Sequence, residues 1–295
     1  MLAPWLDLDG LPALVTDWSQ ATGLDLRRLG TDADADEIRA TAITQPLVVA
    51  TSLLAASRLD IPAGAVTAGH SVGELAAAAI AGVITSTQAT ALASTRGTAM
   101  QGACALVPTS MAACMNPDTD AVLTALSKRN LVGANVNGAG QVVAAGAAAD
   151  IAALVENPPT GVRVIPLQVA GAFHTDYMAP AEAALAPKLA ELTPSDPDRP
   201  LLTNSDGSVV GSGRHYLDLL LSQITSPVRW DRCMSTLTEL GVTGVLELPP
   251  SGTLVGLAKR ELTGVATMAL KTPADLDAAR AFVAEHAGGS AGTAA

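Results

Sequence analysis

Apolar residues in this chain form short runs separated by glycine, proline and small polar residues, and the most informative run lies at 65–83. A β-compatible stretch, Ala65 to Ala68, leads to Gly69, and an alanine-rich, helix-forming stretch begins after Gly73. A strand, a tight turn and a helix in that order are typical of α/β proteins. The same alternation returns later, with strands predicted at 201–203, 244–248 and 266–270 and helices predicted at 216–224, 231–240, 253–261 and 273–286.

The chain before and after this unit is expected to be largely helical. An apolar run follows Pro46, and because proline suits the first turn of a helix, the pattern predicts a buried helix over 46–58. Gln45 would precede that helix as a capping or loop residue. Farther along the chain, the segment Thr85-Ser86-Thr87 is expected to cap a helix over 88–100.

Between residues 104 and 173 the pattern changes to short strands and helices in the order β-α-β-β-α-β, which is the ferredoxin-like arrangement. The strands are expected at 110–114, 131–136, 141–145 and 162–167, and the helices at 117–129 and 147–156. The Asn-Gly-Ala-Gly sequence at 137–140 suits a hairpin turn. We therefore expect a subdomain over 104–173, inserted into a discontinuous large domain formed by 1–103 and 174–287, and a disordered tail over 288–295.

Composition and charge exclude several classes of protein. The chain is 49% hydrophobic and 15% charged, which is typical of a folded domain, and its net charge of −11 argues against nucleic acid as a partner. No apolar run is long enough to span a membrane, and the start has no basic signal-peptide region. The three cysteines form no CxxC pattern and no histidine–cysteine cluster is present, so we expect a reduced, cytoplasmic chain without a metal.

The turn at 69–73 reads Gly-His-Ser-Val-Gly and matches the G-x-S-x-G pattern. A serine on a tight strand-to-helix turn needs small residues on both sides, and the turn exposes its hydroxyl in a cleft. The first N–H groups of the following helix point at the same place and can stabilise an oxyanion. The alternative is a glycine-rich turn without chemistry, but the strand before it and the helix after it favour Ser71 as a nucleophile.

A serine nucleophile needs a general base, and the chain has four histidines. His70 is adjacent to Ser71 on the turn, so its side chain should point away. His215 lies in a polar segment and His286 lies near the tail. By elimination the base is His174, at a junction between a predicted strand and a predicted helix.

Arg96 is the one charged residue in a helical stretch that otherwise contains small and apolar residues. An arginine on a helix is usually a solvated surface charge. Its small neighbours would also allow the guanidinium group to face a cleft, and the spacing alone leaves both interpretations open.

Several motifs occur in an order that resembles a known family: GHSVGE at 69–74, Arg96-Gly97, Asn135 to Gln141, Gly171 to His174, Pro227 to Trp230, and Pro250 to Leu254. Together they resemble the malonyl-CoA:acyl-carrier-protein transacylases of bacterial fatty-acid synthesis, in their actinobacterial form, over about residues 1–285. The resemblance implies an α/β-hydrolase-like large domain with an inserted ferredoxin-like α+β subdomain. We expect a monomer that acts on a coenzyme A thioester and an acyl carrier protein.

The mechanism that the resemblance implies is ping-pong acyl transfer. His174 takes the proton of Ser71, Ser71 attacks the malonyl thioester, coenzyme A leaves, and the phosphopantetheine thiol of the carrier protein takes the malonyl group. The resemblance further implies that the Val72 N–H is an oxyanion donor and that the backbone carbonyl of Arg229, instead of a carboxylate, orients His174. Malonyl-CoA is the expected substrate, and no bound cofactor is expected.

The resemblance also implies the residues of the acyl pocket. Arg96 is expected to pair with the free malonyl carboxylate, and Gln45 and His70 are expected to contribute to substrate binding. Phe173 is expected to crowd out an α-methyl group, so that malonyl is selected over methylmalonyl. Because the carrier protein is acidic, as this chain is overall, docking is expected to use a local basic patch.

Two other functions stay open at this stage. A serine hydrolase or thioesterase of the same fold would have no use for a cation in its acyl pocket, and a catalytically impaired docking module would keep only the fold. Relatives begin with a short apolar strand and a Gly-Gln-Gly-x-Gln turn, which supplies a second oxyanion donor, before the segment that here starts at Met1. Either Gln45 or water substitutes in a functional short form, or Met1 is an internal methionine of a longer protein, which is the explanation we favour.

Overall fold

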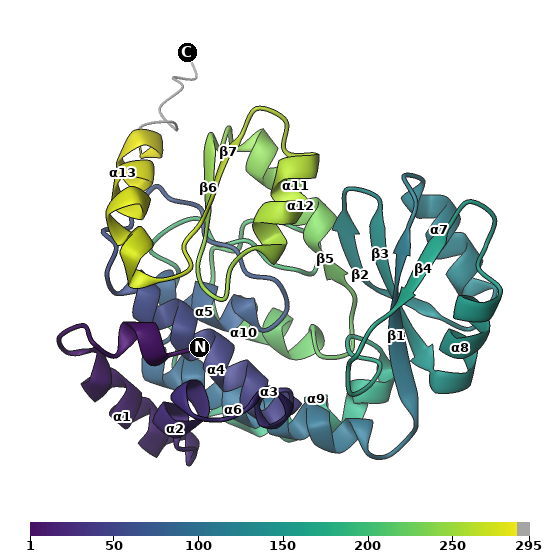
Figure 1. Cartoon of the computed structure of the whole chain (residues 1–295), viewed down its shortest axis with the longest axis horizontal. Helices are drawn as coiled ribbons and strands as arrows, with labels where there is room; N and C mark the ends of the chain where they lie inside the picture. The colour runs from purple at the N-terminus through teal and green to yellow at the C-terminus, as the bar shows by residue number, and fades with distance from the viewer. Residues whose placement is uncertain (288–295) are drawn as a thin grey trace.

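The computed structural model describes residues 1–287, and the disordered tail expected over 288–295 lies outside the described residues. The N-terminal part is helical, as expected. It contains a 3₁₀ turn and the helices α1 (Leu11–Thr22), α2 (Leu26–Thr31), α3 (Ala35–Ile38) and α4 (Thr41–Ala56) (Figure 1). None of the helices described over residues 1–287 has the length and apolar character needed to cross a membrane.

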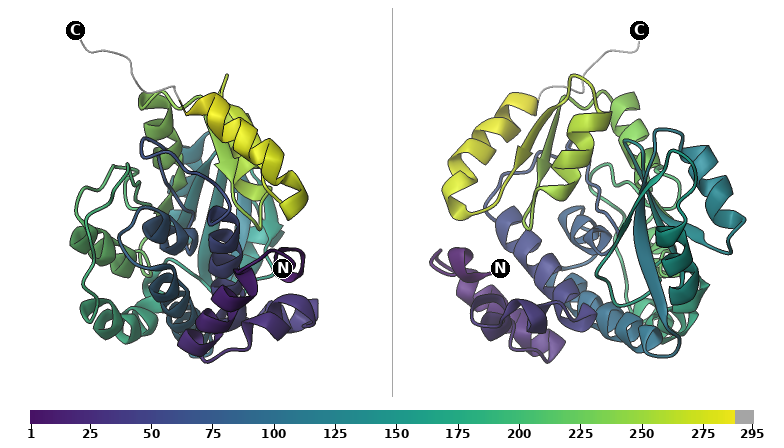
Figure 2. Two further views of the ribbon diagram at one scale, coloured as in Figure 1. Left: turned by 90° about the vertical axis from the view of Figure 1, so that its left-hand side faces the viewer. Right: turned by 45° about the vertical axis from the view of Figure 1, so that its right-hand side comes forward.

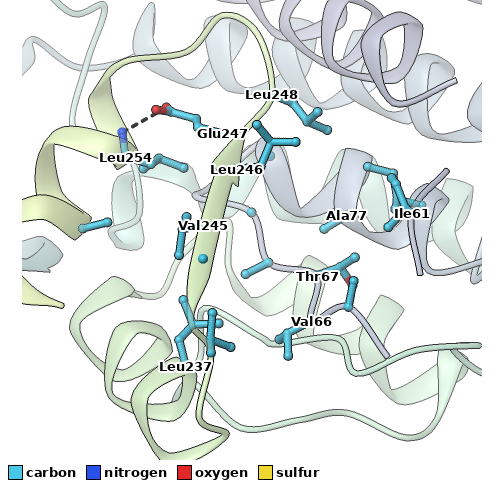
Figure 3. Close-up of a pocket in the computed structure, with 18 of the residues that line it drawn as sticks. Ile61, Val66, Thr67, Ala77, Leu237, Val245, Leu246, Glu247, Leu248 and Leu254 are labelled. Atoms are coloured by element: carbon cyan, nitrogen blue, oxygen red, sulfur yellow. Dashed lines mark hydrogen bonds between the residues drawn. The ribbon is translucent and has the colours of Figure 1, made fainter. Parts of the chain in front are cut away.

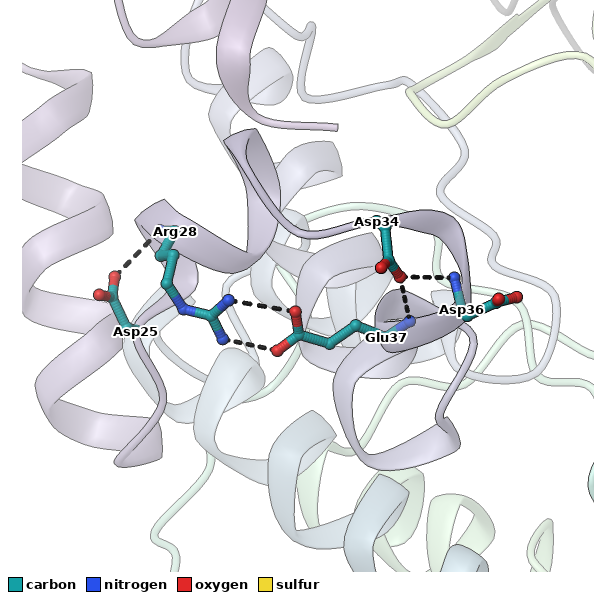
Figure 4. Close-up of polar contacts among 5 residues, drawn as sticks. All are labelled: Asp25, Arg28, Asp34, Asp36 and Glu37. Carbon is teal, nitrogen blue, oxygen red and sulfur yellow. Dashed lines mark hydrogen bonds and ion pairs between the residues drawn. The ribbon is translucent and has the colours of Figure 1, made fainter.

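Short-range polar contacts define the start of α3. The carboxylate of Asp34 accepts hydrogen bonds from the backbone N–H groups of Asp36 and Glu37, at 3.0 and 2.8 Å, and so caps the helix (Figure 4). Arg28 on α2 forms a bidentate pair with Glu37, with N···O distances of 3.1 and 2.6 Å. Both partners are exposed, so solvent screens this pair and it mainly fixes how α2 meets α3.

Helix α4 begins earlier than the sequence predicts. It spans Thr41–Ala56, so Pro46 lies inside the helix and Gln45 lies on it as a buried residue. The prediction of a helix over 46–58 with Gln45 as a capping or loop residue is therefore wrong. Proline removes one N–H from the helix, but the face of α4 that packs on its neighbours is fully buried, and this packing outweighs the local signal.

The helix that carries Arg96 is the centre of the large helical core. This helix, α6 (Ser86–Cys104), begins within the predicted capping segment 85–87, two residues earlier than expected. Thr85 is the cap residue, and its side chain and Gln88 form a reciprocal capping box. It packs against α4, α1, α5 (Gly73–Ile80) and α9 (Ala179–Ala190). A Cβ atom at Gly97 would lie 2.6 Å from the Thr41 carbonyl oxygen, so a glycine there allows α4 and α6 to approach closely.

The β-α-β-β-α-β order predicted for 104–173 is confirmed. Its elements are β1 (Thr109–Met115), α7 (Thr119–Ser127), β2 (Val132–Gly138), β3 (Gln141–Ala147), α8 (Ala148–Glu156) and β4 (Arg163–Pro166). The sheet order is β4-β1-β3-β2-β5, with antiparallel pairs except for β2 and β5 (Val228–Arg229), which are parallel. Because β5 comes from beyond residue 173, the sheet continues into the chain outside the expected subdomain.

The sheet separates two apolar clusters. Alternate residues of β1 point to opposite faces, so Ala112 packs in the cluster beneath α7 and α8, whereas Met111 packs in a second cluster with Ala172 and the half-buried Phe173. Figures 1 and 2 show α7 and α8 on the outer side of this sheet, at one end of the molecule. The inner face of the sheet therefore supports the segment that leads to His174.

The C-terminal part also follows the predicted alternation. It contains α10 (Gly213–Ser222), α11 (Trp230–Glu239), β6 (Gly244–Glu247), α12 (Thr253–Glu261), β7 (Ala266–Ala269) and α13 (Leu276–His286). Strands β6 and β7 form a separate parallel pair. The strands expected at 65–68 and 201–203 are reduced to single bridges, in which Thr67 pairs with Leu201 and Leu202 pairs with Val209.

An apolar cavity of about 490 Å³ lies between β6 and the 65–69 segment (Figure 3). Thr67 donates to Pro200 and accepts from Leu202, whereas Val66 and Ala68 have no backbone partner within residues 1–287. Because only Thr67 bonds to the 200–202 segment, the 65–69 segment forms an isolated bridge and no regular strand. His70 and Val72 also line this cavity.

Candidate active site

Ser71 lies on a strained turn between the 65–69 segment and α5. Its φ angle is 53°, in the left-handed region that residues with a side chain rarely adopt. A Cβ atom on Gly69 would lie 2.1 Å from the carbonyl carbon of Gly73, so no larger residue fits at that position. The Ser71 N–H donates to Asn204 Oδ1 at 2.7 Å, which holds the turn in place.

The structure brings Ser71 and His174 together. The His174 Nε2 atom lies 2.7 Å from Ser71 Oγ, and His174 is 3% exposed. On the other side of the ring, Nδ1 donates to the backbone carbonyl of Gln223 at 2.8 Å. With its hydrogen on Nδ1, the ring presents the Nε2 lone pair to the serine hydroxyl, as a general base requires.

The prediction that the Arg229 carbonyl orients His174 is wrong. That role belongs to the carbonyl of Gln223, which is the C-terminal cap residue of α10. Carbonyl groups at the end of a helix lack intrahelical partners and carry partial negative charge, so they are available to an imidazole. Arg229 instead donates its backbone N–H to Asn204 at 2.8 Å and pairs its side chain with Asp231 at 2.7 Å.

Arg96 is buried and faces the serine, so it is not a solvated surface charge. Its Nη1 donates to Gln45 Oε1 at 2.7 Å, and its Nη2 donates to Gln223 Oε1 at 2.8 Å and to Ser71 Oγ at 3.2 Å. Burial lowers the pKa of Arg96 to about 10, which still leaves the guanidinium charged at neutral pH. No carboxylate among the described residues forms an ion pair with it.

Two other predicted site residues, Val72 and His70, flank Ser71 on the turn. Val72 is the residue before the first residue of α5, and its N–H has no acceptor within the part of the chain that the structure describes, as an oxyanion donor requires. His70 points away from Ser71, with Nε2 2.8 Å from Asn137 Oδ1 and its ring edge-on to Trp230. The position of His70 therefore supports a role in holding the turn against β2 more than direct substrate contact.

Three residues at the site were not identified from the sequence: Glu74, Asn204 and Gln223. Asn204 accepts from Ser71, and Gln223 contacts both His174 and Arg96. Glu74 accepts hydrogen bonds from both of these residues. The signal for Glu74 was its place on the buried side of the helix after the turn, but nothing in the sequence links Asn204 or Gln223 to Ser71.

The electrostatic environment of His174 leads to a prediction on pH. Burial, followed by the positive charge of Arg96, lowers the pKa of His174 to about 3. A lowered pKa means that the neutral, basic form persists as the pH falls. The rate of serine acylation should therefore stay nearly constant from pH 7 to pH 5, where an ordinary histidine becomes protonated. Rapid-quench measurement of acyl-enzyme formation tests this, and a tenfold loss of rate near pH 6 would contradict it.

Comparisons with known proteins agree with this geometry. Residues 16–279 match the family model described as "Acyl transferase domain". The chain is 51% identical over 282 residues to the malonyl CoA-acyl carrier protein transacylase of Mycobacterium tuberculosis, covering 94% of this chain and 93% of that protein.

Comparison with solved structures also finds similarity to transacylases. The crystal structure of MCAT from M. tuberculosis superposes with a TM-score of 0.91 at 49% identity, over 95% of this chain and 94% of that one. A malonyl-transacylase in complex with a type II PKS acyl-carrier protein superposes with a TM-score of 0.87 at 29% identity, over 95% of this chain and 94% of that chain.

Proposed function

The chain belongs to the acyl transferase domain family, and on this premise we propose that it transfers malonyl groups from coenzyme A to an acyl carrier protein. In the first half-reaction His174 takes the hydroxyl proton as Ser71 Oγ attacks the thioester carbonyl. Coenzyme A leaves as the thiol and the malonyl group becomes an ester of Ser71. In the second half-reaction the phosphopantetheine thiol attacks that ester, with His174 again carrying the proton.

The observation that carries this proposal is the position of Arg96. Its Nη2 lies 3.2 Å from the nucleophilic oxygen, in a buried setting where Gln45 and Gln223 supply neutral acceptors. An unpaired guanidinium beside a nucleophile suits an acyl group that ends in a carboxylate, because a bidentate pair there is strong and oriented. A hydrolase for neutral esters gains nothing from a cation in this place.

The fold supports the same family. The order β4-β1-β3-β2 with two covering helices supports a ferredoxin-like subdomain, and the Ser71 turn at the start of α5 supports an α/β-hydrolase-like large domain. The acyl carrier protein is the second substrate, in line with the solved complex of a related transacylase with its carrier. Side chains and backbone groups supply every step, so the proposed reaction asks for no bound cofactor.

A product assay separates transfer from hydrolysis. The purified chain is incubated with radiolabelled malonyl-CoA in the presence or absence of acyl carrier protein in its phosphopantetheine form. We expect label on the carrier, with little free malonate in either reaction. Release of malonate at the same rate with and without carrier would support the hydrolase alternative.

Phe173 is expected to exclude larger acyl groups. It precedes His174 in the chain and packs with Met111 and Val143 at the inner face of the sheet. Shortening it opens space for one more methyl group, and one methylene is worth about 1–3 kcal/mol in a hydrophobic pocket. Phe173→Ala should therefore raise kcat/KM for methylmalonyl-CoA relative to malonyl-CoA by about tenfold or more. An unmodified enzyme that already uses both thioesters equally would contradict this role.

A further inference from the structure

A buried carboxyl group lies beneath the catalytic turn. Glu74, on the first turn of α5, is 1% exposed and forms no ion pair with any described residue. Its Oε1 accepts from the backbone N–H of Asn204 at 2.6 Å, and its Oε2 accepts from Gln223 Nε2. Neither partner belongs to α5, so the carboxyl does not serve as a cap for its own helix.

Both partners of Glu74 act directly on reacting groups. The side chain of Asn204 accepts from the Ser71 N–H at 2.7 Å and donates to the Gly69 carbonyl at 2.7 Å, so it clamps both sides of the turn. Gln223 orients His174 through its carbonyl and Arg96 through Oε1, at 2.8 Å in each case. A single carboxyl therefore contacts the residues that orient the nucleophile, the base and the cation.

The carboxyl is one of the groups that fix which way the Gln223 amide points. An amide has an acceptor end and a donor end. Glu74 accepts from the donor end, together with the Ser71 carbonyl at 3.2 Å and Asn204 Oδ1 at 3.3 Å, and the oxygen faces Arg96. The opposite orientation would place an NH₂ group against the guanidinium, donor against donor, and would leave Arg96 without one of its two side-chain amide acceptors.

We propose that Glu74 is a positioning residue for malonyl selection, acting through the Gln223 amide on Arg96. This inference rests on the proposed function, because it assumes that Arg96 receives the malonyl carboxylate. Burial raises the pKa of Glu74 to about 8, against hydrogen bonds from Asn204 and Gln223 and the positive charge of Arg96, which lower it. The role as an acceptor on both oxygens therefore belongs to the ionised carboxylate, which predominates above about pH 8. Burying a carboxyl group costs free energy, so its presence beneath the turn accords with a specific function.

The test is Glu74→Gln, assayed at about pH 9, where the parent carboxyl is ionised. The substituted side chain has the same shape and can still accept from Asn204, but its NH₂ then faces the NH₂ of Gln223. Because the Asn204 N–H needs the oxygen of the substituted amide, we expect the Gln223 amide to turn and Arg96 to lose an acceptor. We expect kcat/KM for malonyl-CoA to fall about 10- to 100-fold, the loss typical of a mispaired hydrogen bond to a charged group. Acetyl-CoA has no carboxylate for Arg96, so its kcat/KM should change far less.

The ratio of the two substrates separates positioning from general destabilisation. Both are measured on one preparation, so the folded fraction cancels. Glu247→Gln is the matched control, because Glu247 is also buried and accepts backbone N–H groups of Gly252, Leu254 and Val255 at the start of another helix. It should lower stability without changing the ratio of malonyl to acetyl use.

A double-mutant cycle with Gln223→Met completes the test. If Glu74→Gln does not fold, the Gln223→Met single variant is measured in its place. Methionine keeps the length of Gln223 but contacts neither Glu74 nor Arg96 by hydrogen bonds. Gln223→Met alone should lower the ratio, and adding Glu74→Gln should lower it no further. An unchanged ratio in either single variant, with normal malonyl use by the parent, would overturn the positioning role alone. A parent chain inactive toward malonyl-CoA would overturn the proposed function instead.

Discussion

Replacing Ser71 with alanine is expected to abolish acyl-enzyme formation and to reduce malonyl transfer by about 10⁴–10⁶-fold, because Ser71 is the group that carries the malonyl group between the two thiols in the proposed mechanism. Replacing His174 with alanine should cost nearly as much. Its Nε2 lies 2.7 Å from Ser71 Oγ and acts in both half-reactions. Steady-state transfer to the carrier protein measures both losses.

The double variant provides the internal check. Nucleophile and base act as one unit, so removing both should cost little more than removing Ser71 alone. Circular dichroism and thermal unfolding serve as controls for folding. A His174→Ala enzyme that keeps its rate within a few-fold of the parent would show that another group is the base.

Replacing Arg96 with alanine should weaken malonyl transfer by about 2–5 kcal/mol, the cost of leaving a desolvated charge without its partner. At about 1.4 kcal/mol for each factor of ten, this is a loss of roughly 30- to 4,000-fold in kcat/KM for malonyl-CoA. Use of acetyl-CoA should fall much less, so the enzyme should relatively gain uncharged acyl groups.

Arg96→Lys is the matched variant for this effect. Lysine keeps the positive charge but cannot make the bidentate contact, and it reaches Gln45 and Gln223 with a single ammonium group. Its malonyl activity should lie between that of the alanine variant and the parent. Equal losses on malonyl-CoA and acetyl-CoA in Arg96→Ala would show that Arg96 supports the fold or the serine, and that something else binds the carboxylate.

The parts of the fold that could be predicted from the sequence depend on local signals. The cap at Thr85, the alternating strands of 104–173 and the helix after Gly73 all rest on residues close together in the chain. The start of α4 was missed because its burial against α6 overrides the usual preference of Pro46 for a helix start. Tertiary packing between distant segments produces no recognisable pattern in the local sequence.

The same dependence on local signals determines which site residues could be predicted from the sequence. Ser71 could be predicted from the turn that surrounds it, and His174 by elimination. Gln223 could not, because its link to His174 and Arg96 joins segments 49 and 127 residues apart. The family resemblance predicts that Arg96 and Gln45 both lie at the acyl pocket, and the structure joins them by a hydrogen bond. It assigns the carbonyl that orients His174 to Arg229, six residues after Gln223, whose carbonyl has that position.

Intact-protein mass spectrometry after brief exposure to malonyl-CoA detects the acyl-enzyme itself. We expect one malonyl adduct, located on Ser71 by peptide mapping, absent from Ser71→Ala, and lost when phosphopantetheine-bearing acyl carrier protein is added as malonyl-carrier forms. An adduct on another residue, or an adduct that the carrier protein does not discharge, would contradict transfer through Ser71.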